Sequence, residues 1–286
     1  MAQIQHILFP FDFSAAGLRA VPFVRALANH LHARVTLLSV MAPTWVEPLP
    51  GLGPIVAEDP EDLSRQLQAL LDRSLTEELA DLEVARVTAS GDPAQRITAF
   101  AHDNAVDLIM MPTHGCGLFR SLLIGSVTAK VLHDAKCPVW TAAHTEKQHA
   151  PELPKTVLCA LDESEESLSV LQRAAEFCRQ IDAALNLLHV VRPASDWLAL
   201  ESERELQEEL RNEARTRVDA IRNSAGVNAP LRVAVGEIAA TVAEEARQEG
   251  ADLILLGRGS LQSTLGSLRT HAYGIIQSSP CPVLSV

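Results

Sequence analysis

The chain has 286 residues with 24 Lys or Arg and 36 Asp or Glu, so its formal net charge is −12. This balance argues against a basic surface of the kind that binds nucleic acid or anionic membranes. Hydrophobic residues make up 47% and aromatic residues 4%, which indicates a globular protein rich in aliphatic side chains and poor in rings that could stack on bases. We expect about two domains.

Five cysteines without a C-x-x-C pair are expected to be free thiols in a reducing compartment. No apolar stretch reaches the roughly 18 residues that a membrane span requires, and no secretory signal pattern opens the chain. We therefore expect a cytoplasmic protein.

The first half alternates between predicted strands and helices. Short apolar runs rich in β-branched residues predict strands that are buried on both faces. These runs are residues 4–9, 35–40, 84–88, 108–111 and 139–142.

Helices are predicted between these strands. The first begins near Ser14 and contains Pro22, which should bend it. The second has Asp59 as its N-cap and the third is opened by Asp92. The last covers residues 127–133, and residues 42–58, rich in Pro and Gly, are expected to be a mobile surface segment that can cover a site.

The second half repeats the first. The sequence around Asp12 returns around Asp162, an offset of 162 − 12 = 150. Asp107-Leu108-Ile109 returns at an offset of 145, and Cys137-Pro138-Val139 returns at 144. We therefore predict two homologous domains, residues 1–145 and 154–286, joined by a polar linker. Each is expected to be a doubly wound α/β domain of about five parallel strands.

Ligands of such sheets bind beyond the carboxyl ends of the strands, where the strand order reverses. Asp12 lies at the tip of the first strand, where its carboxylate can accept hydrogen bonds from a ribose or a base, or can cap the following helix in competition with Ser14. After the fourth strand, Gly115 lets the backbone approach a phosphate, and Gly125-Ser126 opens a helix whose N–H groups favour an anion. Alternatively, these glycines only shape a turn and Ser126 only caps the helix.

The combination of PFDFS, LLSV, SGDPAQRI, DLIMMPTHG, GSVTAKVL and CPV resembles the universal stress protein family in its tandem form. The resemblance covers nearly the whole chain. It implies two Rossmann-like domains of the adenine nucleotide alpha hydrolase type, paired about a pseudo-two-fold axis through strands 138–141 and 282–286. ATP-binding members carry G-x-x-G, nine residues, then G and S or T, whereas this chain has Pro112 at the first glycine.

The resemblance implies that Asp12 and Val40 hold adenosine and that Gly115, Gly125 and Ser126 hold phosphates, with Mg²⁺ carried on ATP. No separate metal site and no catalytic residue are predicted. The candidate binding set is Pro10, Asp12, Val40, Met111, Gly115, Gly125, Ser126 and Val127.

The second repeat departs further from the family pattern. Counting back from Cys281 places Arg269-Thr270 opposite Gly125-Ser126, so we predict a largely structural domain that retains Asp162. The function we expect is a cytoplasmic stress protein, regulatory or protective, that binds an adenine nucleotide in its first domain.

Two alternatives stay open. One is a weak ATPase or nucleotidyl-transferring enzyme with His114 as its acid or base, and the other is an interaction scaffold that binds no nucleotide, for which Pro112 is the main support. A homodimer of chains is also left open.

Overall fold

A computed structural model describes residues 3–42, 60–113, 124–142, 153–164, 166–193, 200–258 and 267–286. The side chains of residues 60, 200–205 and 267–270 lie outside the description. Asp59, the predicted cap, and residues 43–58 of the predicted surface segment also lie outside it.

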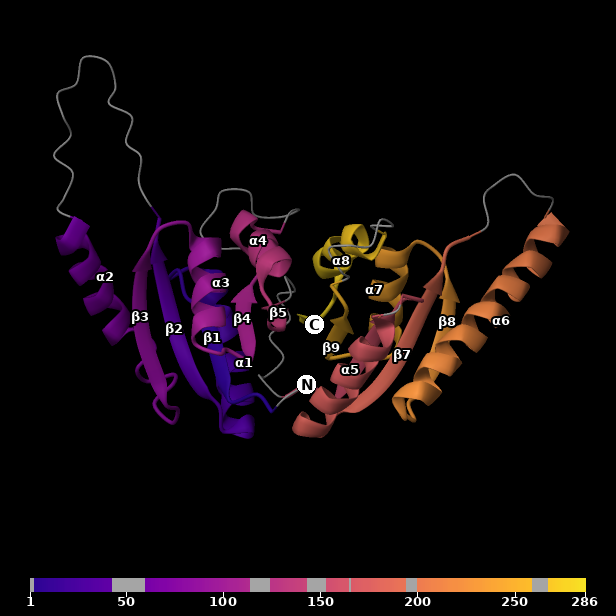
Figure 1. Cartoon of the computed structure of the whole chain (residues 1–286), viewed down its shortest axis with the longest axis horizontal. Coiled ribbons are helices and arrows are strands. Elements are labelled where there is room, and N and C mark those ends of the chain that lie inside the picture. Colours follow the sequence, from indigo (N-terminus) through magenta and orange to yellow (C-terminus); the bar gives the residue numbers. More distant parts are fainter. Residues whose placement is uncertain are drawn as a thin grey trace, which may run out of the picture. The chain divides into compact units, whose positions relative to one another are not determined.

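Strands and helices alternate through both halves of the chain (Figure 1). The first half comprises β1 (His6–Pro10), α1 (Ala15–Leu31), β2 (Arg34–Met41), α2 (Pro60–Arg73), β3 (Val84–Ser90), α3 (Pro93–Asp103), β4 (Leu108–Pro112), α4 (Ser126–Asp134) and β5 (Val139–Ala142). The second half comprises β6 (Thr156–Leu161), α5 (Ser167–Ile181), β7 (Ala184–Val191), α6 (Leu200–Ala225), β8 (Leu231–Val235), α7 (Ile238–Gln248), β9 (Leu253–Leu256), α8 (Ser267–Ser278) and β10 (Val283–Ser285).

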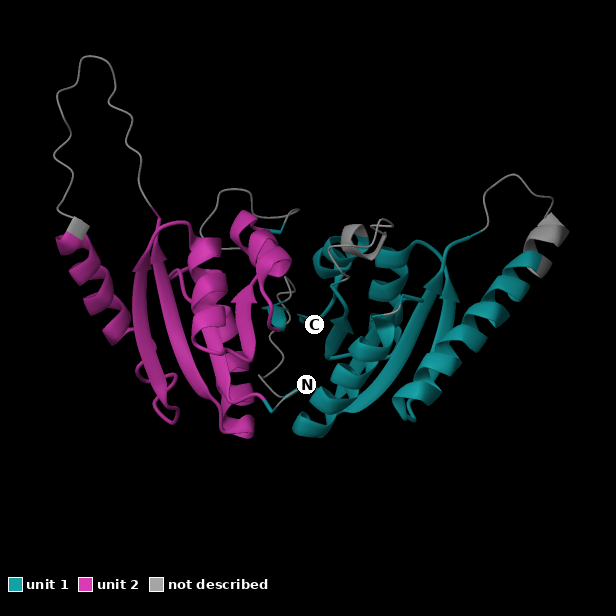
Figure 2. Ribbon diagram, in the orientation of Figure 1, with its two compact units in different colours: residues 1–3, 119–124, 138–286 teal, residues 4–118, 125–137 magenta. Residues whose placement is uncertain are grey.

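The chain divides into two compact units (Figure 2). The N-terminal unit, magenta in Figure 2, holds β1 to β4 with α1 to α4 in the parallel order β3-β2-β1-β4. Its helices α3 and α4 pack together on one face of the sheet, while α1 lies on the other face (Figure 1). The predicted doubly wound α/β architecture is thus confirmed in this unit.

The C-terminal unit, teal in Figure 2, holds β5 to β10 with α5 to α8. Its strand order is β5-β10-β9-β6-β7-β8, and β6 to β10 are mutually parallel. β5 pairs with β10 in the antiparallel direction, with Trp140 opposite Leu284 at the centre. The pairing predicted for these terminal strands is therefore present, and it places the fifth strand of the first repeat in the C-terminal unit.

The repeated Asp-Leu-Ile motif has the same structural role twice. Asp107 Oδ2 accepts the backbone N–H groups of Gln5 and His6 at 2.9 and 3.0 Å. Asp252 Oδ2 makes the same two bonds at the start of β6, also at 2.9 and 3.0 Å. Each carboxylate therefore satisfies the N–H groups where a central strand enters the sheet.

One local expectation, the burial of β3, needs correction. β1 and β4 are buried almost throughout, but β3 is half-exposed because it lies at the edge of the order β3-β2-β1-β4. Helix α1 continues through Pro22 from Ala15 to Leu31. Proline removes the N–H that would bond the Leu18 carbonyl, and Leu18 is 49% exposed, so water can take that bond.

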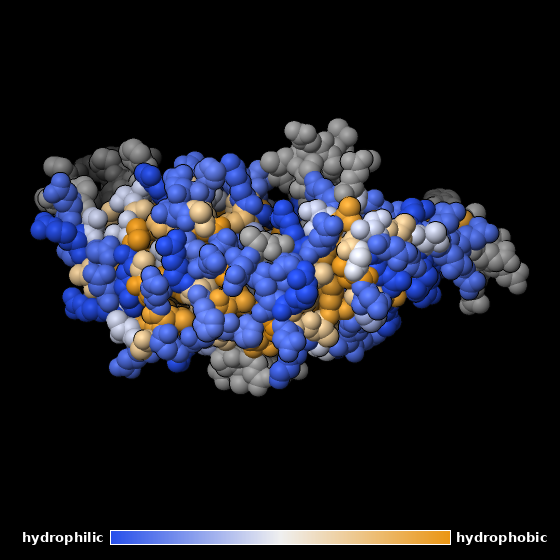
Figure 3. All heavy atoms as spheres, turned by 60° about the horizontal axis from the view of Figure 1, so that its bottom comes forward, coloured by the Kyte–Doolittle hydropathy of each residue, from blue (hydrophilic) through white to orange (hydrophobic). Residues whose placement is uncertain are grey.

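Most of the surface seen in Figure 3 is hydrophilic, with smaller hydrophobic areas between the charged side chains. Among the described residues, the large hydrophobic side chains that are more than a third exposed are Leu18, Leu70 and Leu168. Within the described ranges, no helix combines the length and the hydrophobicity that a membrane crossing demands.

Candidate functional site

The strand order of the N-terminal unit reverses between β1 and β4, since β2 and β3 follow β1 on one side and β4 lies on the other. Ligand crevices of parallel sheets form at this point, beyond the carboxyl ends. Pro10 is the last residue of β1 and Asp12 follows it, Val40 lies near the end of β2, and Met111 lies in β4. The fold therefore brings four predicted binding residues to one edge.

These four residues differ in exposure. Asp12 is exposed, and Pro10 and Val40 are half-buried. Met111 is only 5% exposed, so its side chain belongs to the core. Their roles in binding stay predictions.

Ser14, rather than Asp12, caps helix α1. The Ser14 hydroxyl accepts the N–H of Gly17 at 3.0 Å. Asp12 Oδ1 accepts the N–H of Ser14 at 3.0 Å and so fixes the turn before the helix. The competition between the two residues for the cap is settled in favour of Ser14, and the Asp12 carboxylate lies outside the helix at the exposed edge.

Helix α4 begins beside the end of β4. Its N-cap is Gly125, and no described side chain caps it. Gly125 donates its N–H to the Thr113 carbonyl at 2.9 Å, and the Thr128 hydroxyl donates to the Pro112 carbonyl at 3.1 Å. These bonds hold the N-terminus of α4, which is the positive end of its dipole, beside the carboxyl end of β4.

The residues around this helix start fall into two groups. Ser126 is exposed and Val127 half-buried in its first turn. Gly115 and His114 lie outside the described residues, so the predicted loop contact and the predicted acid or base are not placed.

Lys130, one turn into α4, contacts Asp92 with its Nζ 3.2 Å from Oδ2. Asp92 also caps α3 by accepting the Gln95 N–H at 3.0 Å. That backbone bond, followed by the bond from Lys130, lowers the pKa of Asp92. Lys130 therefore links α4 to α3 through its ion pair with Asp92.

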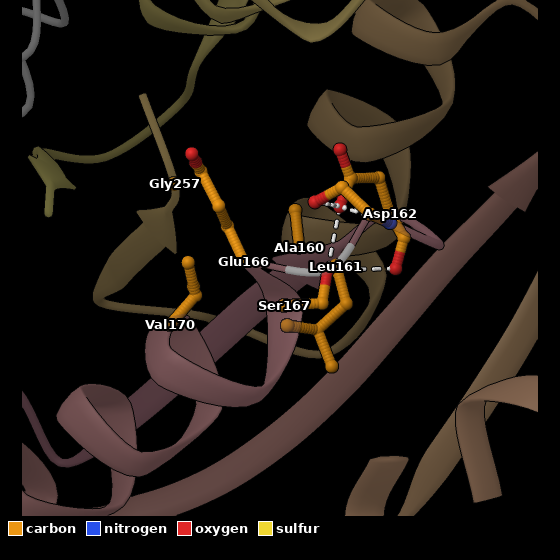
Figure 4. A pocket seen from close by; sticks show the side chains of 8 residues that line it. Ala160, Leu161, Asp162, Glu166, Ser167, Val170 and Gly257 are labelled. Atoms are coloured by element: carbon orange, nitrogen blue, oxygen red, sulfur yellow. Dashed lines mark hydrogen bonds between the residues drawn. The ribbon is translucent and has the colours of Figure 1, made fainter. Parts of the chain in front are cut away.

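The corresponding aspartate of the C-terminal unit is engaged by its own loop. Asp162 Oδ1 lies 3.1 Å from Ser164 N, 2.6 Å from Ser164 Oγ and 2.5 Å from Ser167 Oγ. Asp162 and Ser167 are labelled in Figure 4, where dashed lines mark hydrogen bonds between the residues drawn. The D-x-S-x-x-S spacing carried this signal, which the analysis of the sequence missed.

A small hollow lies beside Asp162 (Figure 4). Ser167, Val170 and Gly257 help to line it, and its free volume is about 10 Å³. A volume of this size holds about one water molecule. A Cβ added to Gly257 would lie 2.7 Å from Val170 Cγ2, so Val170 occupies the space that the glycine opens.

The predicted equivalence of Arg269-Thr270 with Gly125-Ser126 needs correction. α8 begins at Ser267, so Arg269 and Thr270 lie inside its first turn. The helix has 12 residues where α4 has 9. Counting from Cys281 misses this difference because α8 is extended at its N-terminal end.

In the described part of the chain, no three His, Cys, Asp or Glu side chains are grouped to hold a metal ion. The cysteines described are free thiols, and burial raises the pKa of Cys178 and of Cys281 to about 12, so neither supplies a ready thiolate.

Comparison with known proteins gives one consistent result. The model of the universal stress protein family matches residues 3–142 and again residues 154–286. A universal stress protein of Thermus aquaticus is 34% identical over 137 residues, which cover 46% of this chain and 94% of the relative. One from Methanocaldococcus jannaschii is 29% identical over 147 residues, covering 46% of this chain and 91% of the relative.

Among solved structures, a universal stress protein from Archaeoglobus fulgidus covers 99% of this chain and 96% of its own, with a TM-score of 0.68 and 20% identity. This likeness concerns the fold.

Proposed function

Since this chain belongs to the universal stress protein family, we propose that its first repeat binds ATP or another adenine nucleotide. The protein then acts as a regulatory or protective module of a stress response, in the cytoplasm. The observation that carries the proposal is the start of α4, where a glycine N-cap without a described side-chain cap lies at the strand-order reversal.

An uncapped helix N-terminus offers N–H donors and a positive dipole to an anion. Two other helices of this unit are capped by their own side chains, since Ser14 caps α1 and Asp92 caps α3. Gly125 has no side chain that could cover the N–H groups of Ser126 and Val127. Phosphate oxygens are the proposed partners of these groups, together with the Ser126 hydroxyl.

Asp12 supports the nucleoside end of the proposal. Its carboxylate can accept a ribose hydroxyl, and the half-buried Val40 can offer its backbone to the base. The position five residues after Asp12 is Gly17, which carries no hydroxyl to engage the carboxylate as Ser167 engages Asp162. Gly115 would complete the phosphate contacts, with Mg²⁺ held by the phosphates and Ser126.

Pro112 removes one backbone donor from the family pattern. Its carbonyl is nevertheless used inside the fold, because it accepts the Thr128 hydroxyl. We propose that the remaining donors of α4 are sufficient, and that the second repeat binds no nucleotide because the hydroxyls of Ser164 and Ser167 already engage the Asp162 carboxylate.

The test is a calorimetric titration of nucleotide-free protein with ATP and Mg²⁺. We expect one ATP per chain and no binding in Gly125→Arg, whose side chain would fill the phosphate position. Asp12→Asn should weaken binding about tenfold through the loss of a charged acceptor. The matched control Asp162→Asn should leave the affinity unchanged.

Two results would overturn the proposal. A stoichiometry of two would show that the second repeat binds as well. No heat, together with no ligand-induced rise in melting temperature, would show that Pro112 prevents binding and would favour the scaffold.

A further inference from the structure

Lys130 lies on the same face of helix α4 as the first residue of that helix. Thr128, Val131 and Leu132 form the buried face of α4. Ser126 and Lys130 are both exposed and lie four residues apart, a spacing that makes two side chains neighbours on a helix surface. Lys130 is therefore next to the turn whose N–H groups are the proposed phosphate donors.

The direction of helical side chains brings the ammonium group of Lys130 toward this turn. A long side chain on a helix points back toward the N-terminus and covers the turn that precedes its own Cα. Lys130 carries its charge on a flexible four-carbon stem, and its side chain is 59% exposed. It is also the only Lys or Arg in α4. The helix thus places one positive charge, on a flexible side chain, beside its own positive end.

The ion pair with Asp92 holds Lys130 only weakly. The Lys130 Nζ lies 3.2 Å from Asp92 Oδ2, and exposed ion pairs of this kind contribute little to stability. Asp92 does not depend on this contact, because its Oδ1 accepts the Gln95 N–H at 3.0 Å and so caps α3. Lys130 can therefore move away while the Asp92 carboxylate keeps a hydrogen-bond partner.

Arg96, in the first turn of α3, is held more firmly. Its Nε donates to the Ser90 carbonyl at 2.7 Å. Its side chain also packs over Gly91, where an added Cβ would lie 2.8 Å from the same nitrogen. The backbone thus fixes Arg96 over the turn between β3 and α3. Of the two cations, Lys130 is the one that a ligand can recruit.

The second repeat has no lysine at the matching position. Helices α4 and α8 end at Asp134 and Ser278, an offset of 278 − 134 = 144, and this offset aligns Lys130 with Gly274. A Cβ added to Gly274 would lie 3.1 Å from Ala239 Cβ of α7, so α7 and α8 approach each other closely there. The lysine that links the two helices is therefore a feature of the first repeat.

We propose that Lys130 selects ligands by the length of their phosphate chain. On binding, Lys130 leaves Asp92 and pairs with a phosphate beyond the one that the N–H groups of Ser126 and Val127 hold. A diphosphate or triphosphate therefore gains a contact that a monophosphate or a nucleoside lacks. This inference rests on the proposed function, because it assigns a further residue to the same site.

Calorimetric titration with adenosine, AMP, ADP and ATP, each with Mg²⁺, tests the inference. We expect the affinity of the wild type to rise from AMP to ATP. Lys130→Gln should lower the affinity for ATP about tenfold, the size of one charge-assisted contact, and should leave the affinities for AMP and adenosine unchanged. Lys130→Arg, which keeps the charge, should retain most of the affinity for ATP.

Asp92→Asn separates recognition of phosphate from a structural role of the ion pair. It breaks the same pair as Lys130→Gln, and asparagine still caps a helix. The released ammonium group should raise the affinity for ATP about threefold, the size of an exposed ion pair. A pair that only holds α4 against α3 would instead make both variants bind ATP more weakly, and that result would overturn the inference.

Two further results would also overturn it, and they differ in what they say of the proposed function. Equal losses of affinity for ATP and adenosine in Lys130→Gln, or no loss, would remove the inference while the proposed function stands. No binding of any of the four ligands by the wild type would remove both together. The melting temperature of each variant without ligand shows whether its fold is retained.

Discussion

The loops that follow β1 and β6 begin with equivalent aspartates, Asp12 and Asp162. Different kinds of side-chain contact stabilise the two loops. In the first repeat, the ring of Phe11 lies 5.8 Å from that of Phe9 and 4.9 Å from that of Phe13, so an aromatic cluster holds the loop. In the second repeat, Glu163 replaces Phe13 and is bound by Arg217 and His189. The repeated motif therefore preserves the path of the chain, while the interactions that support it differ between the repeats.

A second difference concerns the space beside each aspartate. Gly17 and Ala20 of the first repeat correspond to Ser167 and Val170 of the second, at an offset of 150. The larger residues engage Asp162 and close the space beside Gly257. These two substitutions thus account for the side chains that fill the space beside Asp162 in the second repeat.

Breaking the aromatic cluster should have the largest effect. Phe11 is 3% exposed, and Phe11→Ala should lower the free energy of unfolding by about 3–5 kcal/mol through lost burial and a cavity. Urea denaturation measures the loss. Leu161→Ala, at the matching position of the second repeat, should cost less because no ring cluster depends on Leu161, and an equal or larger cost would contradict the assignment of aromatic support to the first repeat alone.

Enlarging Gly257 should have an intermediate effect. The added methyl of Gly257→Ala meets Val170 Cγ2 at 2.7 Å, and overpacking of this kind costs about 1–3 kcal/mol. Adding Val170→Ala, which restores the residue type of Ala20, should recover part of the loss. Denaturation midpoints of the two single variants and the double variant check this, and strictly additive losses would show that Val170 is not what fills the space.

Acidification should have the smallest effect, and it should affect both repeats alike. Helix N–H groups lower the pKa of Asp92, with a further contribution from Lys130, and the Ala240 N–H is the main cause that lowers the pKa of Glu237. A carboxyl whose pKa is lowered by folding contributes stability above its unfolded pKa of about 4, and this is lost as pH falls through the folded value. Asp92→Asn and Glu237→Gln should each flatten the fall in urea midpoint between pH 5 and pH 3, and an unchanged slope would show that the caps do not depend on charge.

Much of the fold could be predicted because its signals are local and occur twice. The alternation of strands and helices follows from the apolar runs, and the two repeats follow from motifs such as Asp107-Leu108-Ile109 and Cys137-Pro138-Val139. The pairing of the terminal strands was expected only from the family resemblance. The half-exposure of β3 was not predictable from its apolar run, because position in a sheet depends on distant partners. The predicted equivalence of Arg269-Thr270 with Gly125-Ser126 was wrong because a fixed offset from Cys281 does not allow for the greater length of α8.

The candidate site could be predicted only in outline. Motif spacing brought Asp12, Val40 and Gly125 to one edge, but it could not show that Met111 is buried there. The ion pair between Glu163 and Arg217 was also missed, since Arg217 lies 54 residues away in α6. Such charge networks arise from tertiary packing, so the spacing of residues along the sequence does not predict them.

The pairing of β5 with β10 can form only late in the synthesis of the protein. The Thr141 hydroxyl bonds to the Val283 carbonyl across 142 positions of the chain. At about 5–20 residues per second, a ribosome leaves β5 without this neighbour for roughly 7–28 s. During that interval the nascent chain carries an apolar strand with an open edge, the kind of surface on which chaperones act and on which a neighbouring nascent chain can pair by mistake.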